Sequence, residues 1–261
     1  IPLQKTRNRN RVLLLFLLLL AGADGLFHLG AGGVLDVSPL TGVRIALYGV
    51  VLLVAVMGGR VIPSFTANAL PHAGVKTQRK LDLASVAGAG AAFVAVVAVP
   101  SSPLTGVLCA VAAGLHLLRL RGWAPLATRR TPILWVLHTS YAWIPVGLGL
   151  HALQAFGLLD GATLADHALG VGAVGGVILG MITRTARGHA GRPLTVGRVE
   201  TTAYALLIMA AGLRVLVPAA IPGAARAAIA IAGLLWVAAF VLYLIVYVPW
   251  LTRPRADGRP G

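Results

Sequence analysis

The sequence predicts an all-α membrane protein, a polytopic bundle of about eight transmembrane helices. Three observations lead to this fold. Eight apolar runs are long enough to cross a bilayer, whose hydrocarbon core of about 30 Å requires roughly 20 residues of helix. Hydrophobic residues make up 58% of the chain and charged residues only 11%, whereas a soluble domain carries about 25% charged residues. The basic residues are gathered in clusters between pairs of apolar runs.

The apolar runs are assigned in chain order. They cover residues 12–31, 41–58, 81–99, 103–120, 131–154, 164–184, 199–217 and 225–250. Alternate connections are short and contain Pro or Gly, which are typical of turns. Because short connections place consecutive helices side by side and antiparallel, we expect one bundle, a single integral-membrane domain over residues 1–261.

Five basic clusters predict the orientation of this bundle. They lie in residues 5–11, 60–80, 119–130, 184–198 and 253–259. Two apolar runs separate successive clusters, so all five can face the same side of the membrane. Loops rich in Lys and Arg stay in the cytoplasm, which predicts that the basic loops and both chain ends are cytoplasmic. The net charge of +15 is therefore a topology signal. Nucleic-acid-binding modules combine basic residues with interleaved aromatic residues, and the sequence contains no such module. We therefore expect the lipid bilayer as a partner and no nucleic acid.

Three features inside the runs bear on packing and cofactor attachment. Gly172, Gly176 and Gly180 share one helix face and predict close packing against a neighbouring helix. Pro145 should kink the fifth run and free a carbonyl one turn earlier. Cys109 is the single cysteine, which excludes an intrachain disulfide and covalent haem attachment through a C-x-x-C-H motif.

Histidines are the most informative polar residues of the spans, because ionisable groups in membranes are costly and usually functional. Sorted by predicted depth, they are His28, His151 and His167 near outer ends, His116 and His138 nearer inner ends, and His72 and His189 in inner loops. Imidazole is the commonest ligand of metals and a frequent ligand of haem iron. Histidines from several helices therefore predict a metal or haem site.

Two histidines have suggestive neighbours. Asp24 lies four residues before His28, so the two side chains share one helix face. This carboxylate would orient a ligating ring, form a proton relay, or make a locally satisfied pair. Trp135 and Tyr141 flank His138 at three residues on either side, an arrangement that suits either a flat haem or aromatic residues at the membrane boundary.

Four segments resemble motifs of the NnrS family. Residues 59–70 read G-R-V-I-P-S-F-T-A-N-A-L, and residues 134–148 read L-W-V-L-H-T-S-Y-A-W-I-P-V-G-L. Residues 167–184 read H-A-L-G-V-G-A-V-G-G-V-I-L-G-M-I-T-R and run on to G-H-A-G-R-P-L at residues 188–194. The F-H-L of residues 27–29 matches as well. The four matches occur in the family's order, which makes the resemblance specific.

The resemblance implies a multi-pass protein of the bacterial cytoplasmic (inner) membrane that contains noncovalent haem and copper. The family is tied to nitric-oxide metabolism, nitrosative-stress resistance and denitrification. Its members have about twelve spans, so this chain is expected to be N-terminally truncated and to correspond to the C-terminal two-thirds of a member.

The resemblance also selects histidines. Those inside the matching motifs are His28, His138, His167 and His189, and together they form the predicted metal-ligand set. We expect His28, His138 and His167 to bind the cofactor with Asp24 beside them. His116 and His151 fall outside the clearest motifs and rank lower.

The predicted function is that of a haem- and copper-containing membrane protein whose ligand is nitric oxide or a related small molecule. No quinone, flavin or nucleotide signature identifies an electron donor, so both turnover and simple binding of nitric oxide stay open. The alternative is a proton-coupled transporter that uses Asp24 and buried histidines. An inverted repeat or a pair of broken helices would favour that alternative. Neither is evident in the eight runs.

Overall fold

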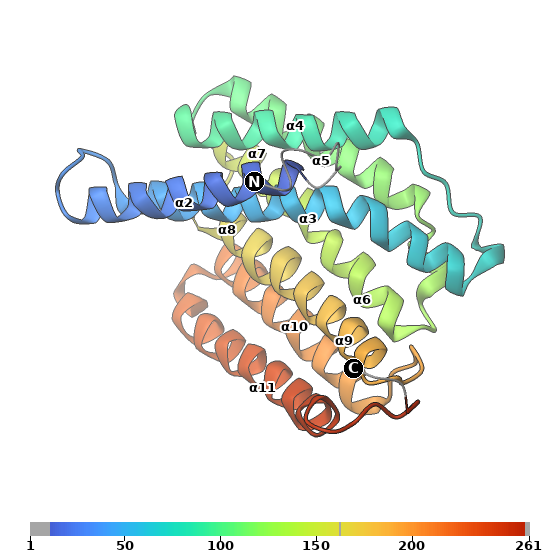
Figure 1. The fold of residues 1–261 in the computed structure, drawn as a ribbon. Coiled ribbons are helices and arrows are strands. Elements are labelled where there is room, and N and C mark those ends of the chain that lie inside the picture. The colour runs from blue at the N-terminus through green and yellow to red at the C-terminus, as the bar shows by residue number, and fades with distance from the viewer. Residues whose placement is uncertain (1–10, 162, 259–261) are drawn as a thin grey trace.

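The computed structural model describes residues 11–161 and 163–258, which are helical apart from short connections (Figure 1). Within these ranges, eight helical segments are long and apolar enough to cross a membrane. The predicted fold class, an all-α polytopic bundle, is therefore confirmed. Six crossings are dominated by one helix each: α2 (Arg11–Ala31), α3 (Pro39–Ala69), α4 (Arg79–Ala98), α5 (Pro103–Gly122), α10 (Arg198–Ala220) and α11 (Ala225–Leu251).

Two crossings are composite. The fifth consists of α6 (Pro132–Tyr141) followed by α7 (Trp143–Ala155). The sixth consists of α8 (Leu164–His167), a π-helical segment (Ala168–Gly175) and α9 (Gly176–His189). Short 3₁₀ turns at Pro71–Ala73, Pro125–Thr128 and Pro222–Ala224 complete the described helices.

The break between α6 and α7 confirms the expected effect of Pro145. Proline has no backbone N–H and its ring collides with the carbonyl four residues earlier, here that of Tyr141. The helix is interrupted at Ala142, and α7 restarts at the next residue with Pro145 in its first turn.

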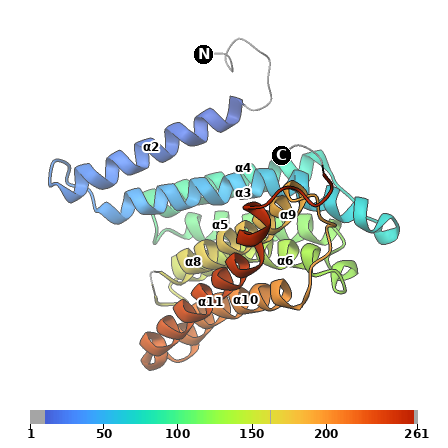
Figure 2. The same ribbon diagram turned by 60° about the horizontal axis from the view of Figure 1, so that its bottom comes forward.

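Consecutive helices form antiparallel pairs: α2 with α3, α4 with α5, and α10 with α11 (Figures 1 and 2). Helices α6 and α9 pack together in the middle of the bundle. Helices α2 and α11 lie at its edges (Figure 2), and few of their residues are buried. Of the predicted site residues, Asp24 and His28 therefore lie on an edge helix, whereas His138, His167 and His189 belong to the elements from α6 to α9.

Two helices are longer than the sequence predicts. Residues 59–69 were expected in a loop, but α3 continues through them despite Gly58, Gly59 and Pro63. Residues 184–189 likewise belong to α9. Tertiary contacts outweigh local propensity here, because the extension of α3 buries Ile62, Pro63 and Thr66 against the bundle.

Contacts among loops and helix ends place four basic clusters at one end of the bundle, hereafter the basic end. The Lys76 N–H donates to the Gly122 carbonyl at 2.7 Å, and the Ala256 N–H donates to the Ala190 carbonyl at 3.0 Å. The Arg184 guanidinium lies 3.7 Å from the ring centroid of Phe65. The remaining cluster, residues 5–11, lies outside the described residues except for its last member.

The glycine ladder of the sixth crossing is a packing surface, as predicted. A Cβ at Gly172 would meet the Trp143 ring, one at Gly176 would lie 2.7 Å from the Ser140 Cβ, and one at Gly180 would lie 2.7 Å from Leu137 Cδ2. These partners belong to α6 and α7. The ladder therefore sets how closely the fifth and sixth crossings approach.

Replacing Gly176 with leucine should destabilise the bundle by at least about 1–3 kcal/mol, the usual range for overpacking a filled site. The expected result is a lower midpoint of thermal unfolding in detergent. Gly188→Leu is the matched control on α9, because a Cβ at Gly188 has no atom within 4 Å. Equal midpoints for the two variants would contradict the packing role.

Candidate functional site

Of the histidines, His138 has the surroundings that best suit a metal ligand. Its side chain is buried, and its Nε2 lies 2.9 Å from Thr66 Oγ1. The Thr66 hydroxyl donates its own hydrogen to the Ile62 carbonyl at 2.9 Å, so His138 Nε2–H is the donor to Thr66. The other nitrogen, Nδ1, is then unprotonated, and it is buried without a hydrogen-bond partner in the described part of the chain.

The same side chain lines a cavity of about 460 Å³ beside the 3₁₀ turn at Pro125–Thr128. The walls are mainly apolar, and one guanidinium is present. The lining includes Leu120, Leu126, Arg129, Trp135 and Thr139. A mostly apolar cavity of 300–1,000 Å³ with a few polar groups is the usual form of a cofactor site.

A buried polar network lies next to His138, on the far side of the fully buried Trp123. The Trp123 ring centroid is 6.5 Å from that of His138 and 4.6 Å from that of Tyr141. Tyr141 Oη lies 2.7 Å from His116 Nδ1 and accepts from Arg119 Nη1 at 2.9 Å. Tyr141 therefore connects the Arg119 guanidinium to the buried His116 ring.

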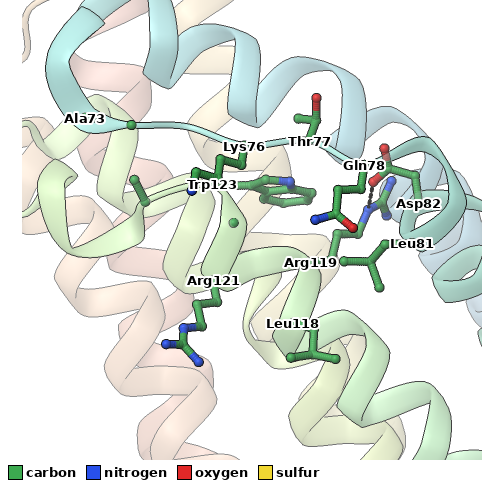
Figure 3. Close-up of a pocket in the computed structure, with 13 residues that line it drawn as sticks. Ala73, Lys76, Thr77, Gln78, Leu81, Asp82, Leu118, Arg119, Arg121 and Trp123 are labelled. Atoms are coloured by element: carbon green, nitrogen blue, oxygen red, sulfur yellow. Dashed lines mark hydrogen bonds and ion pairs between the residues drawn. The ribbon is translucent and has the colours of Figure 1, made fainter.

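Arg119 anchors this network to the basic end. Its Nε donates to Asp82 Oδ1 at 2.6 Å, and its Nη1 donates to the Ala55 carbonyl at 2.8 Å. The Asp82–Arg119 ion pair forms part of the wall of a second cavity, of about 430 Å³ (Figure 3). Lys76 and Trp123 also line this cavity. Arg119 belongs to a basic cluster in the sequence, but it is only 4% exposed and serves the interior.

A separate polar cluster lies toward the opposite end of the bundle, on α3, α7 and α8. The Tyr48 hydroxyl donates to Asp166 Oδ1 at 2.7 Å and lies 3.2 Å from His151 Nε2. Arg44 Nε donates to Asp166 Oδ2 at 3.1 Å. The charge of Arg44, a residue of the second apolar run, is thus paired with a carboxylate of the chain.

The structure does not bring the predicted ligand set together. Asp24 and His28 are exposed on α2, with Oδ1 and Nε2 3.7 Å apart. His189 is exposed at the end of α9. His167 is half-buried beside Arg214 in a cavity of about 280 Å³. No group of three His, Cys, Asp or Glu side chains with metal-binding geometry occurs among the described residues.

Sequence reasoning placed too little weight on His116, His151 and the groups around them. A signal was present, because the chain has only seven acidic residues and three of them, Asp82, Asp166 and Glu200, lie at the ends of apolar runs. A carboxylate in a span needs a cationic or hydrogen-bonding partner. The sequence indicates this need, but it does not identify Arg119 and Arg44 as the partners.

The chain is similar to a known protein family. The family model described as "NnrS protein" matches residues 2–255, nearly the whole chain. No curated protein and no solved structure matches the chain.

Proposed function

Because this chain belongs to the NnrS family, we propose that it is a haem-binding membrane protein of nitric-oxide metabolism and nitrosative-stress resistance, with His138 as the iron ligand. The nitric-oxide role comes from the family resemblance. The choice of His138 comes from one observation: a buried imidazole that lines a cavity and has one nitrogen without a hydrogen-bond partner among the described residues.

The residues around His138 suit this role. A ligating histidine normally uses its second nitrogen to donate to a neighbouring group that fixes the ring, and Thr66 is that neighbour here. Leu120, Leu126 and Trp135 would cover the flat faces of the cofactor, and Arg129 would pair with one of its acid groups. Haem held there would supply an iron that can bind diatomic ligands such as nitric oxide.

The histidines of the family motifs do not contribute equally in this proposal. His138 keeps its predicted role. His28, with a side chain 71% exposed, and His189, which is also exposed, lack the buried setting of His138. Copper, the other metal that the resemblance implies, finds no three-residue site in the described ranges, so we assign no residues to it.

The proposal includes a location. The basic end would face the cytoplasm of a bacterium and the opposite end the periplasm, because Lys- and Arg-rich loops remain on the cytoplasmic side. The cavity at His138 would then lie toward the cytoplasmic half of the inner membrane.

The test is the visible spectrum of the purified chain in detergent, oxidised and reduced, before and after addition of nitric oxide. We expect a Soret band that shifts when nitric oxide is added. Consumption of nitric oxide by the reduced protein would indicate turnover, whereas a spectral shift alone would indicate binding. A folded but colourless protein, made with ample haem supply, would contradict the proposal.

A colourless protein would favour the second candidate, a proton-coupled transporter. One observation supports that alternative: the Tyr48–His151–Asp166 cluster places a carboxylate and an imidazole inside the bundle. Asp166 would then be the coupling carboxylate in place of the predicted Asp24, which is exposed.

A further inference from the structure

Three arginines of the crossing helices are paired with an acidic side chain of the chain itself. The pairs are Arg44 with Asp166, Arg119 with Asp82, and Arg187 with Glu200. The pairing has a physical reason, because a cation inside a membrane span is costly unless an anion or water accompanies it.

Arg214 of α10 departs from this pattern. It lies six residues before the end of the helix at Ala220, which is about 9 Å along the axis, and its side chain is partly buried. Its Nε is fully buried and has no hydrogen-bond partner among the described residues. An unsatisfied buried donor of this kind indicates a partner that the described chain does not supply.

Arg214 lines the cavity of about 280 Å³ at the end of the bundle opposite the basic end, together with His167. Asp160 also lines this cavity, but it is exposed and forms no ion pair with Arg214 in the part of the chain that the structure describes. Two side chains with N–H donors therefore share one cavity, and no described carboxylate neutralises the guanidinium.

The remaining wall of the cavity is mainly apolar. It is formed by Leu164, Pro218, Pro222, Ala225 and Ile229. A volume of about 280 Å³ lies at the small end of the range for ligand sites. The cavity therefore suits a small molecule with one anionic group and a short apolar body.

The cavity is enclosed by the C-terminal half of the chain. Its lining comes from α8, α10, α11 and the connections between them. Helix α2, with which the described chain begins, packs on α3 at the other side of the bundle (Figures 1 and 2). The site consequently does not depend on what lies beside α2.

The backbone next to His167 is also irregular. The π-helical segment Ala168–Gly175 begins directly after this residue. Such segments are rare and occur frequently at functional sites. The irregularity adjoins the cavity at one of its two N–H donors.

We propose that this cavity binds a small acid, with the ionised acid group on Arg214 and His167 and the apolar body against the aliphatic wall. The planar guanidinium of arginine binds a carboxylate or a phosphate through two parallel hydrogen bonds. The imidazole of His167 can donate one more. The same chemistry is offered by a free organic acid and by the headgroup of an acidic lipid.

Thermal unfolding of the purified full chain in a nonionic detergent tests the site, because a ligand of the folded state raises the unfolding midpoint as its concentration rises. Hexanoate is the probe for a free acid, and phosphatidic acid in mixed micelles is the probe for a lipid headgroup. A rise with hexanoate assigns the site to a free acid, and a rise with phosphatidic acid alone assigns it to a lipid. Hexanamide has a similar shape without the charge and should leave the midpoint unchanged.

Arg214→Met should raise the dissociation constant of the bound acid about 10- to 150-fold, the effect of losing a hydrogen bond to a charged group. His167→Phe should raise it about 2- to 10-fold, as expected for a neutral donor. Arg226→Met is the matched control, because Arg226 is exposed near the same end of the bundle and does not line the cavity. It should bind the acid as the parent chain does.

The stability of Arg214→Met without ligand separates a binding role from a structural one. The substitution removes a poorly solvated charge, so its unfolding midpoint should equal or exceed that of the parent chain. A lower midpoint, no rise with either acid, or equal rises with hexanoate and hexanamide would overturn the site. None of these measurements uses haem, so the acid site and the proposed function can fail separately.

Discussion

Alanine at position 138 is expected to give a folded protein that retains little haem after purification. The substitution removes the buried Nδ1 lone pair, which has no hydrogen-bond partner among the described residues, and leaves the cavity of about 460 Å³ without an iron ligand. The ratio of Soret absorbance to protein absorbance measures the loss. Added imidazole should restore part of the band, because a free ring can occupy the space that the side chain vacates.

Two further variants separate ligation from simple damage to the fold. Thr66→Val removes the acceptor that orients His138 but keeps a side chain of similar volume, and it should weaken haem binding about 10- to 100-fold. His28→Ala should leave the haem content unchanged. Full haem content in His138→Ala, together with loss in His28→Ala or His167→Ala, would return the iron to the outer histidines that the sequence predicted.

Arg119→Met should produce the largest loss of stability, about 3–5 kcal/mol, which is typical of removing one partner of a buried ion pair. The guanidinium makes three hydrogen bonds, to Asp82, the Ala55 carbonyl and Tyr141. Methionine fills a similar volume but removes all three hydrogen bonds and leaves the Asp82 carboxylate without its guanidinium partner. Thermal unfolding in detergent, followed by circular dichroism, measures the effect.

The control for this prediction lies two residues further along α5. Arg121 is exposed, so Arg121→Met should change the unfolding midpoint little. Adding Asp82→Leu to Arg119→Met should recover part of the loss, because it removes the carboxylate left unpaired. If Arg119→Met and Arg121→Met unfolded alike, the Asp82–Arg119 pair would contribute nothing to the fold.

The sequence predicts the transmembrane organisation well, because a bilayer imposes a simple physical rule. Each crossing needs a sufficient length of apolar helix, and all eight predicted runs correspond to crossing helices. The break near Pro145 and the packing of the Gly172–Gly176–Gly180 ladder were also correct, since both follow from the local geometry of a helix.

The errors occur where tertiary contacts outweigh local signals. Residues 59–69 contain glycine and proline and were assigned to a loop, yet they continue α3 because Thr66 and its neighbours are buried. Arg119 was assigned to a cytoplasmic basic cluster, yet its side chain lies inside the bundle. A charge near a membrane boundary has the same sequence signal whether it faces water or a buried carboxylate.

The sequence by itself determined the fold class, the number of crossings and the family, because these depend on hydrophobic length and on motifs that are local in the chain. Only the tertiary structure distinguished His138, buried with a free nitrogen, from His28, exposed on an edge helix. The physical reason is that a sequence gives the depth of a residue along its helix but not the neighbours around that helix. Whether an imidazole meets threonine, tyrosine, a cavity or lipid depends on how the helices pack.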